Sequence, residues 1–176
     1  MTEVTFGFVK PDAYRYRSDI VEFIKPFGLS VVVAKDPYFF TEEKAQEHYA
    51  ELREAAFFDV LIQFTIFGLS GLDSKRYGER REVPTSLYVL EGEDAVKTLD
   101  YITGSTNPGL AKAEAQISRL QTIRSRYGRG LPDNAFHRSD SHISASREIQ
   151  LYFTEDDFRR INRKDIWETL HREPYV

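Results

Sequence analysis

The sequence predicts an α/β or α+β sandwich in which helices cover a small sheet. Three observations lead to this expectation. Strand-like segments alternate with helical segments, some helical segments follow one another directly, and 176 residues with 41% hydrophobic content suit one domain with a full hydrophobic core. A ferredoxin-like layout, with α+β character, fits this order of elements.

The first part of the chain is expected to form strand, helix and strand. Val4–Val9 has the apolar content of a strand, and a lysine-proline-aspartate turn ends it. A helix should follow, with Ser18 or Asp19 as its N-cap and Gly28 at its end. Leu29–Ala34 is then expected to be a buried strand.

Two consecutive helices and a long loop are expected next. Thr41 is a suitable N-cap for a helix that runs to about Arg53, because acidic residues follow it in the first turn. Phe57–Thr65 is expected to form the second helix. The polar segment near residues 69–83 is rich in turn-forming residues, so we expect a surface insertion there.

The remaining segments have weaker patterns. Thr85–Leu90 is expected to be a strand and Gly92–Ile102 a helix. Leu110–Ile123 has helical periodicity, whereas Tyr127–Phe136 is irregular. Periodicity leaves Ile143–Tyr152 open between helix and strand.

Composition excludes several classes of protein. No apolar run approaches the roughly 20 residues needed to span a bilayer, and no secretory signal pattern is present, so a cytoplasmic location is expected. Without cysteine there is no thiol nucleophile or cysteine-metal site. The net charge of −4 makes nucleic acid an unlikely partner. Basic segments with interleaved aromatic residues keep an RNA-binding module open as an alternative; they are Lys75–Arg81, Arg124–Gly130 and Phe158–Lys164.

His137 is the best candidate for a nucleophile. A neutral imidazole is the strongest nitrogen nucleophile near neutral pH, and Glu148, eleven positions later, could fix its tautomer and stabilise the charge that develops on attack. The alternative is a metal site formed by His137, Asp140 and His142, although their spacing lacks the HExxH arrangement.

The sequence contains neither GxGxxG nor GxxxxGK followed by serine or threonine, so any bound phosphates must be held by side chains. Seven stretches of sequence occur in the order found in one known family, and together they run from Val4 to Phe153. They are FVKPD, EHYAEL with AFFDVL, LEGEDAV, GSTNP, TIR, NAFHRSDS and SREIQLYF. The chain therefore resembles the nucleoside diphosphate kinases.

This resemblance implies a domain at residues 1–153 with a ferredoxin-like α+β fold and an antiparallel four-stranded sheet covered by helices. Insertions relative to the family lie near residues 69–83 and 109–121. The remaining residues, 154–176, would be a C-terminal extension that packs on the domain or on a neighbouring subunit of a homo-oligomer.

The resemblance also implies a reaction. A nucleoside triphosphate would transfer its γ-phosphate to His137, and a nucleoside diphosphate would then accept it from the histidine. Lys10 would act at the transferring phosphate, and Glu148 and Ser139 would orient the histidine. Mg²⁺ would be held mainly by nucleotide phosphates and water, with no protein ligands. The nucleotide-binding residues implied by motif position are Lys10, Tyr49, Phe57, Thr106, Arg124 and Asn134.

At two other positions, close to these motifs, the chain has a residue that differs from the one in the family. Asp100 lies six residues before Thr106, where the family has a phosphate-binding arginine, and Arg138 follows the histidine, where the family has glycine or alanine. A carboxylate about 4 Å from a phosphate would repel it by about 4 kcal/mol at an effective dielectric near 20. We hypothesise that a nearby arginine compensates; the candidates are Arg76, Arg80, Arg81 and Arg138. The alternative function is that of a degenerate family member that binds nucleotides or a protein partner with little turnover.

Overall fold

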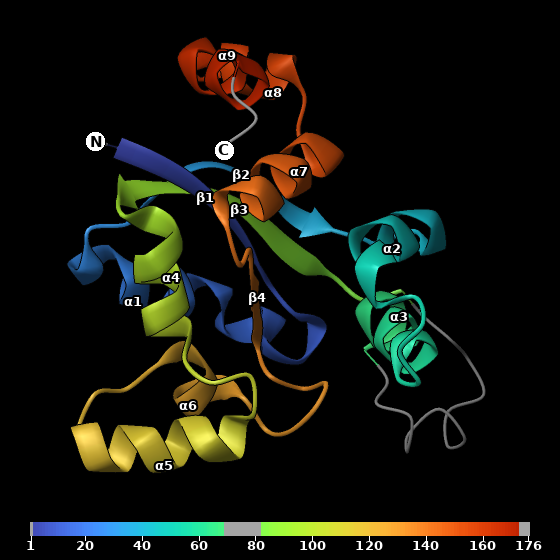
Figure 1. Ribbon diagram of the computed structural model, residues 1–176, viewed down its shortest axis with the longest axis vertical. Coiled ribbons are helices and arrows are strands. Elements are labelled where there is room, and N and C mark those ends of the chain that lie inside the picture. The colour runs from blue at the N-terminus through green and yellow to red at the C-terminus, as the bar shows by residue number, and fades with distance from the viewer. Residues whose placement is uncertain (1, 69–81, 173–176) are drawn as a thin grey trace.

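The computed structural model describes residues 2–68 and 82–172 and contains a four-stranded sheet in the order β2-β3-β1-β4 (Figure 1). All three strand pairs are antiparallel, so the predicted α+β fold class and ferredoxin-like arrangement are confirmed. The strands are β1 (Thr2–Val9), β2 (Ser30–Tyr38), β3 (Thr85–Glu93) and β4 (Phe136–Arg138).

The helices of the described chain include three short 3-10 segments. These segments are η1 (Pro11–Tyr16), η2 (Lys25–Phe27) and η3 (Ala50–Leu52). The α-helices are α1 (Arg17–Ile24), α2 (Glu42–His48), α3 (Phe58–Phe67), α4 (Ala95–Thr103), α5 (Pro108–Ser118), α6 (Ile123–Tyr127), α7 (His142–Tyr152), α8 (Glu155–Arg160) and α9 (Lys164–Arg172). No helix of the described residues is long and apolar enough to cross a membrane.

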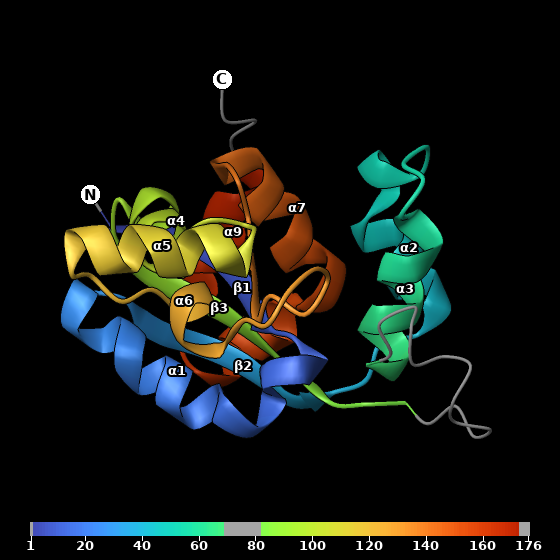
Figure 2. The same ribbon diagram turned by 90° about the horizontal axis from the view of Figure 1, so that it is seen from below.

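Alternation along the central strands divides the core between the two faces of the sheet. On β3, Leu87 and Val89 pack with α7 and its neighbours, on what we call the α7 face. Tyr88 and Leu90 pack with α1 and α4 on the opposite side, the α4 face. Helices α2 and α3 lie side by side at one end of the sheet, away from α1 and α5 (Figure 2). The single sheet therefore supports two separate hydrophobic cores.

Several boundaries in the first half differ from the prediction. Neither Ser18 nor Asp19 caps α1, because the 3-10 turn of η1 leads directly into the helix with Tyr16 at the N-cap. Strand β2 continues to Tyr38 and is only partly buried, since it lies at the edge of the sheet. Thr41 is confirmed as the N-cap of α2, where its Oγ1 accepts a hydrogen bond from Lys44 N at 3.2 Å. This helix ends at His48, before the predicted Arg53, and η3 follows it.

In the second half, the structure shows what the ambiguous segment and the irregular segment form. Ile143–Tyr152 belongs to a helix, α7. Strand β3 extends to Glu93, so the following helix begins at Ala95 and not at the predicted Gly92. The fourth strand, β4, begins where the irregular segment ends, at Phe136, and was not located by the sequence pattern because it has only three residues.

The structure describes one of the two predicted insertions and most of the C-terminal extension, but little of the other insertion. Most of the insertion near 69–83 lies outside the described residues, as do Arg76, Arg80 and Arg81. The segment near 109–121 contains most of α5. Helices α8 and α9 lie beyond α7 at the opposite end of the molecule from α5 (Figure 1), and they bury Phe158, Ile166 and Leu170 in the core of the α7 face.

Candidate functional site

The short strand β4 fixes the position of His137. Its register with β1 places His137 opposite Phe8, and the two rings stack with centroids 4.8 Å apart. Ala135, just before the strand, has a left-handed backbone with φ of 70°, and its N–H donates a hydrogen bond of 3.0 Å to Asp12 Oδ2. The aspartate of the predicted lysine-proline-aspartate turn therefore holds the backbone that leads to the histidine.

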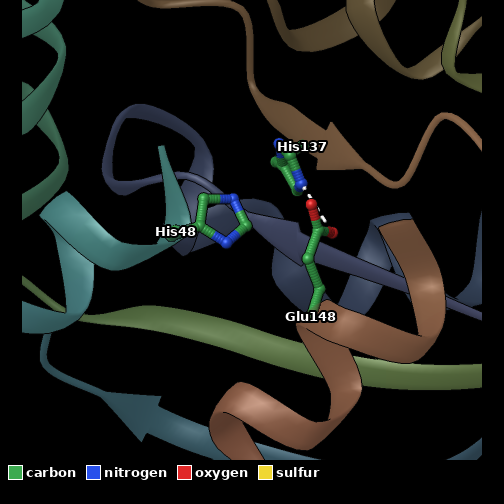
Figure 3. Close-up of side chains that lie close together, drawn as sticks. All are labelled: His48, His137 and Glu148. Atoms are coloured by element: carbon green, nitrogen blue, oxygen red, sulfur yellow. Dashed lines mark hydrogen bonds and ion pairs between the residues drawn. The ribbon is translucent and has the colours of Figure 1, made fainter. Parts of the chain in front are cut away.

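His137 and Glu148 are in direct contact, as their spacing predicted. His137 Nε2 lies 3.1 Å from Glu148 Oε2 (Figure 3). Ser139 Oγ donates to the same oxygen at 2.6 Å. Glu148 is 3% exposed. Burial alone would raise the pKa of Glu148, but the charge and hydrogen bond of His137 lower it to about 2. The ionised carboxylate can only accept hydrogen bonds, so it favours the ring tautomer with hydrogen on Nε2 and a lone pair on Nδ1.

A second histidine, which the sequence analysis did not select, lies beside this pair. The ring of His48, at the end of α2, has its centroid 4.4 Å from that of His137 at an interplanar angle of 72°. His48 is 1% exposed, and burial, followed by the charge of His137, lowers its pKa well below the usual value. Its only signal in the sequence was its place within the EHYAEL segment.

Lys10 lies at the carboxyl end of β1 and is nearly buried. Its Nζ donates to Pro132 O at 3.4 Å, and its backbone N–H donates to Ala135 O at 2.9 Å. Burial and the nearby charge of Arg124 lower the pKa of Lys10 to about 8, against the opposing effect of Asp12. A buried ammonium group with a depressed pKa is stabilised when an anion binds next to it.

Arg124 joins three segments that are distant in sequence. Its guanidinium donates to Gly104 O at 3.0 Å, to Thr106 Oγ1 at 3.2 Å and to Phe136 O at 3.0 Å. Asn134 Nδ2 donates to Thr106 O at 3.0 Å. The structure thus brings Arg124, Thr106 and Asn134 together next to β4. Burial, followed by the charge of Arg138, lowers the pKa of Arg124 to about 10.

Asp100 and Arg138 form an ion pair on the α4 face. Alternation along β4 sends His137 toward the α7 face and Arg138 toward α4, which carries Asp100. Arg138 also donates from Nη1 to Asp140 Oδ1 at 2.7 Å. Asp100 is therefore not an uncompensated charge. Of the four arginines suggested to compensate it, Arg138 is the one in the described chain.

Tyr49 and Phe57 occupy different environments. Tyr49 is 7% exposed, its ring is 6.2 Å from that of His137, and burial raises its pKa. Phe57 is 55% exposed at the N-cap of α3, where a large apolar ring is accessible to a ligand. No contact joins Phe57 to His137 in the described structure.

The suggested metal site of His137, Asp140 and His142 does not form. Asp140 pairs with Arg138, and His142 Nε2 lies 3.6 Å from Glu3 Oε1. Within residues 2–68 and 82–172, the group of at least three possible metal ligands consists of His48, His137 and Glu148, shown in Figure 3.

Comparison with known proteins shows which family the chain belongs to. The family model described as nucleoside diphosphate kinase matches residues 3–158, which extends past the predicted domain boundary at residue 153. The chain belongs to the nucleoside diphosphate kinase family. A nucleoside diphosphate kinase of Methanosphaera stadtmanae is 35% identical over 90% of this chain and 90% of its own length. That of Archaeoglobus fulgidus is 33% identical over 93% and 94%, respectively.

Solved structures of the same family have the same fold. The nucleoside diphosphate kinase of Aquifex aeolicus superposes with a TM-score of 0.72 at 33% identity, covering 89% of this chain and 99% of its own. A halophilic nucleoside diphosphate kinase from Halobacterium salinarum, solved in complex with CDP, gives a TM-score of 0.70 at 32% identity, with 89% and 91% coverage. These matches support the fold and family across most of the chain.

Proposed function

We propose that this protein transfers the γ-phosphate of a nucleoside triphosphate to a nucleoside diphosphate through a phosphohistidine on His137. The observation that carries this proposal is the contact of 3.1 Å between His137 Nε2 and Glu148 Oε2. It leaves Nδ1 as the nitrogen with a lone pair. It also places a carboxylate where it offsets the positive charge that the ring acquires on attack.

The reaction is written in two half-reactions. In the first, Nδ1 attacks the γ-phosphorus, a P–N bond forms, and the bond to the β-phosphate oxygen breaks to release the diphosphate. The hydrogen on Nε2 stays on the ring and continues to donate to Glu148. In the second, the terminal phosphate oxygen of another diphosphate attacks the phosphorus, and the P–N bond breaks to restore the neutral imidazole.

Lys10 and Arg124 are proposed to bind the phosphates. Phosphoryl transfer depends on positioned positive charge, and both residues are buried, where solvent screens charge weakly. Both also donate hydrogen bonds to the backbone directly before His137, Arg124 to Phe136 O and Lys10 to Ala135 O. Thr106 would bind a phosphate oxygen through its hydroxyl. Asn134 would accept a hydrogen bond from the ribose 3′-hydroxyl, because its buried Oδ1 has no partner in the described structure.

Tyr49 and Phe57 complete the proposed nucleotide site. Tyr49 would lie near the γ-phosphate, because it borders the histidine ring. The exposed ring of Phe57 would stack on the base, and this contact would discriminate little between bases because every base has a π face.

The side chains around His137 suit a magnesium ion that arrives with the nucleotide. Mg²⁺ requires oxygen ligands in near-octahedral geometry. The phosphate-facing groups proposed here are cations and neutral oxygens, and the carboxylate of Glu148 is already hydrogen-bonded to His137 and Ser139. The ion would therefore be held by phosphates and water, where it neutralises phosphate charge.

Arg138 is proposed to replace the arginine that the family has at the position of Asp100. It lies directly after the nucleophile and close enough to Arg124 to lower the pKa of that group. Asp100 would orient the guanidinium, and its remaining N–H groups would donate to a phosphate oxygen. The site would keep the same number of phosphate-binding cations, but β4 would supply one of them in place of α4.

Self-association is also proposed. β2 is an edge strand of the sheet and has a row of half-buried valines, Val31 to Val33, so its backbone can pair with another chain. A second copy of the chain would cover this edge. Light scattering coupled to size-exclusion chromatography would give the mass, and a mass of one chain across micromolar concentrations would reject the assembly.

The transfer is tested by incubating the protein with γ-labelled ATP and Mg²⁺ without an acceptor. We expect an acid-labile, base-stable phosphate on His137 that an added diphosphate discharges. His137→Asn should abolish the label, while the matched variant His142→Asn should retain it. Nucleotide binding by the unmodified protein without any label on His137 would instead indicate a binding module with little turnover.

A further inference from the structure

We propose that His48, His137 and Glu148 form a site for a divalent transition-metal ion of the zinc type, and that an ion bound there blocks the nucleophile. Binding of the ion does not depend on the proposed phosphotransfer. Its inhibitory consequence does depend on that function, so the two parts are tested separately.

The spacing of the three residues is close to that of a metal site. Each offers one ligand atom, and these atoms all lie within 4.8 Å of one another. In a tetrahedral zinc site with metal–ligand distances of about 2.0–2.1 Å, the ligand atoms lie about 3.3 Å apart. His137 Nε2 and Glu148 Oε2 are already 3.1 Å apart. A side-chain movement of about 1–1.5 Å by His48 would complete the set.

The state of His48 is the second observation that points to a ligand. Both ring nitrogens of His48 are buried, and neither has a hydrogen-bond partner in the described structure. Buried polar atoms without a partner are rare, because each costs free energy that a hydrogen bond or a metal bond would recover. Figure 3 shows the ring of His48 facing the contact between His137 and Glu148. A metal ion would give one of these nitrogens its missing partner.

The chemistry of the three ligands selects the type of ion. Two imidazole nitrogens and one carboxylate oxygen suit Zn²⁺, whereas Mg²⁺ requires a shell of oxygen atoms. Three protein ligands leave a fourth position for water, as in zinc sites that remain open to solution. The side chain of His137 is 18% exposed and that of Glu148 is 4% exposed, so the cluster is open to solvent mainly at His137.

A metal ion at this position would change which nitrogen of His137 carries the hydrogen. The ion takes the lone pair of Nε2, so the hydrogen on that nitrogen moves to Nδ1 and the neutral ring keeps one N–H. Nδ1 then has no lone pair with which to attack phosphorus. Glu148 exchanges its hydrogen bond with the ring for a bond to the metal. The nucleophile is thus blocked even where Nδ1 remains accessible to the nucleotide.

Zinc binding is measured first, on the nucleotide-free protein after treatment with a chelator. Calorimetric titration with ZnCl₂ should give one ion per chain. His48→Gln should weaken the affinity roughly 100-fold or more, since changes that merely reorient a ligand already cost 10–100-fold. The matched variant His142→Gln, which alters a histidine outside the cluster, should bind zinc as the unmodified protein does. Equal affinities for the unmodified protein and His48→Gln would overturn the proposal.

A crystal of the unmodified protein soaked in ZnCl₂ gives an answer that does not depend on the folding of any variant. Anomalous scattering at the zinc absorption edge should place an ion about 2.0–2.2 Å from atoms of all three residues. Zinc found only at other residues, or no zinc at millimolar concentration, would overturn the proposal.

Inhibition is measured by single-turnover labelling. Zinc-loaded protein, freed of excess ion by gel filtration, should acquire no phosphate from γ-labelled ATP and Mg²⁺ until EDTA is added. The amount of EDTA is kept well below that of Mg²⁺, so that it removes the zinc and leaves Mg²⁺ for the reaction. Full labelling with zinc still bound would overturn the inhibitory part. If the metal-free protein is not labelled either, the proposed function fails, while the titration and the crystal still decide the metal site.

Discussion

The charged side chains on the two faces of β4 have partners that differ in burial. On the α7 face, His137 contacts a carboxylate that is almost fully buried and that also accepts a hydrogen bond from Ser139. On the α4 face, Arg138 pairs with two exposed carboxylates, those of Asp100 and Asp140, whose side chains are 56% and 79% exposed.

This difference explains where the chain departs from its family. A buried charge that loses its partner is strongly destabilising, so the arrangement around Glu148 tolerates little change. Both carboxylate partners of Arg138 are exposed, and ion pairs of this kind contribute little to stability. Placing aspartate at position 100 and arginine at position 138 therefore costs little folding free energy. On the proposed roles of Arg138 and His137, phosphate-binding charge moves between elements more easily than the partner of the nucleophile is altered.

The largest expected effect tests the α7 face. Glu148→Gln should lower kcat roughly 1000-fold, because an amide can donate as well as accept and no longer fixes the tautomer of His137. Ser139→Ala, which removes one hydrogen bond to the same oxygen, should lower kcat by about tenfold. Steady-state exchange kinetics measure both, with Glu155→Gln on α8 as the control. A kcat for Glu148→Gln within about twofold of the unmodified protein would contradict this assignment.

The next prediction concerns acid stability. The pKa of Glu148 is about 2 in the folded state and 4.5 as a reference, so its contribution is present above about pH 4.5 and is lost as the pH falls toward 2. The contribution is on the order of 3 kcal/mol. Urea unfolding at several pH values should therefore show a gap between the unmodified protein and Glu148→Gln that closes below pH 4.5. Asp100→Asn, on the α4 face, should cost less than about 1 kcal/mol at neutral pH because the carboxylate is exposed, and a loss as large as that of Glu148→Gln would break the comparison.

Replacing Arg138 on the α4 face should have a smaller effect, confined to nucleotide binding. Arg138→Gly leaves Asp100 beside the phosphates and should raise KM for the triphosphate by about tenfold or more, because a charge-assisted hydrogen bond is lost. Adding Asp100→Arg to that variant restores the family pattern and should recover most of the loss. A double variant no better than Arg138→Gly would show that Arg138 does not replace the family arginine.

The smallest effect expected is a dependence of nucleotide affinity on pH. Lys10 has a pKa lowered to about 8, so it loses its charge as the pH rises through that value, and phosphate binding weakens. Calorimetry with ADP should show Kd rising several-fold from pH 7 to pH 9, with proton uptake on binding above pH 8. Lys10→Arg should remove the trend because arginine stays charged. An unchanged Kd for the unmodified protein over this range would contradict the role of Lys10.

The sequence predicted most of the elements, because their signals are local. The N-cap Thr41 and the terminating residue Gly28, with φ of 81°, depend only on neighbouring residues. The wrong cap of α1 and the late start of α4 have a different cause. A 3-10 turn displaced the start of α1. The start of α4 was displaced because β3 is longer than predicted, and its last residues pair with the distant strand β1.

By itself, the sequence determined the pairing of His137 with Glu148 and the position of Lys10 at the end of a strand, since both follow from short spacings and from the order of motifs. Only the tertiary structure decided that His137 lies on β4, because three residues have no periodicity of their own and form a strand only against β1. It also decided that His48 lies against the histidine and that Arg138 pairs with Asp100. These contacts join segments far apart in the chain, and only the packing of helices on both faces of the sheet brings them together.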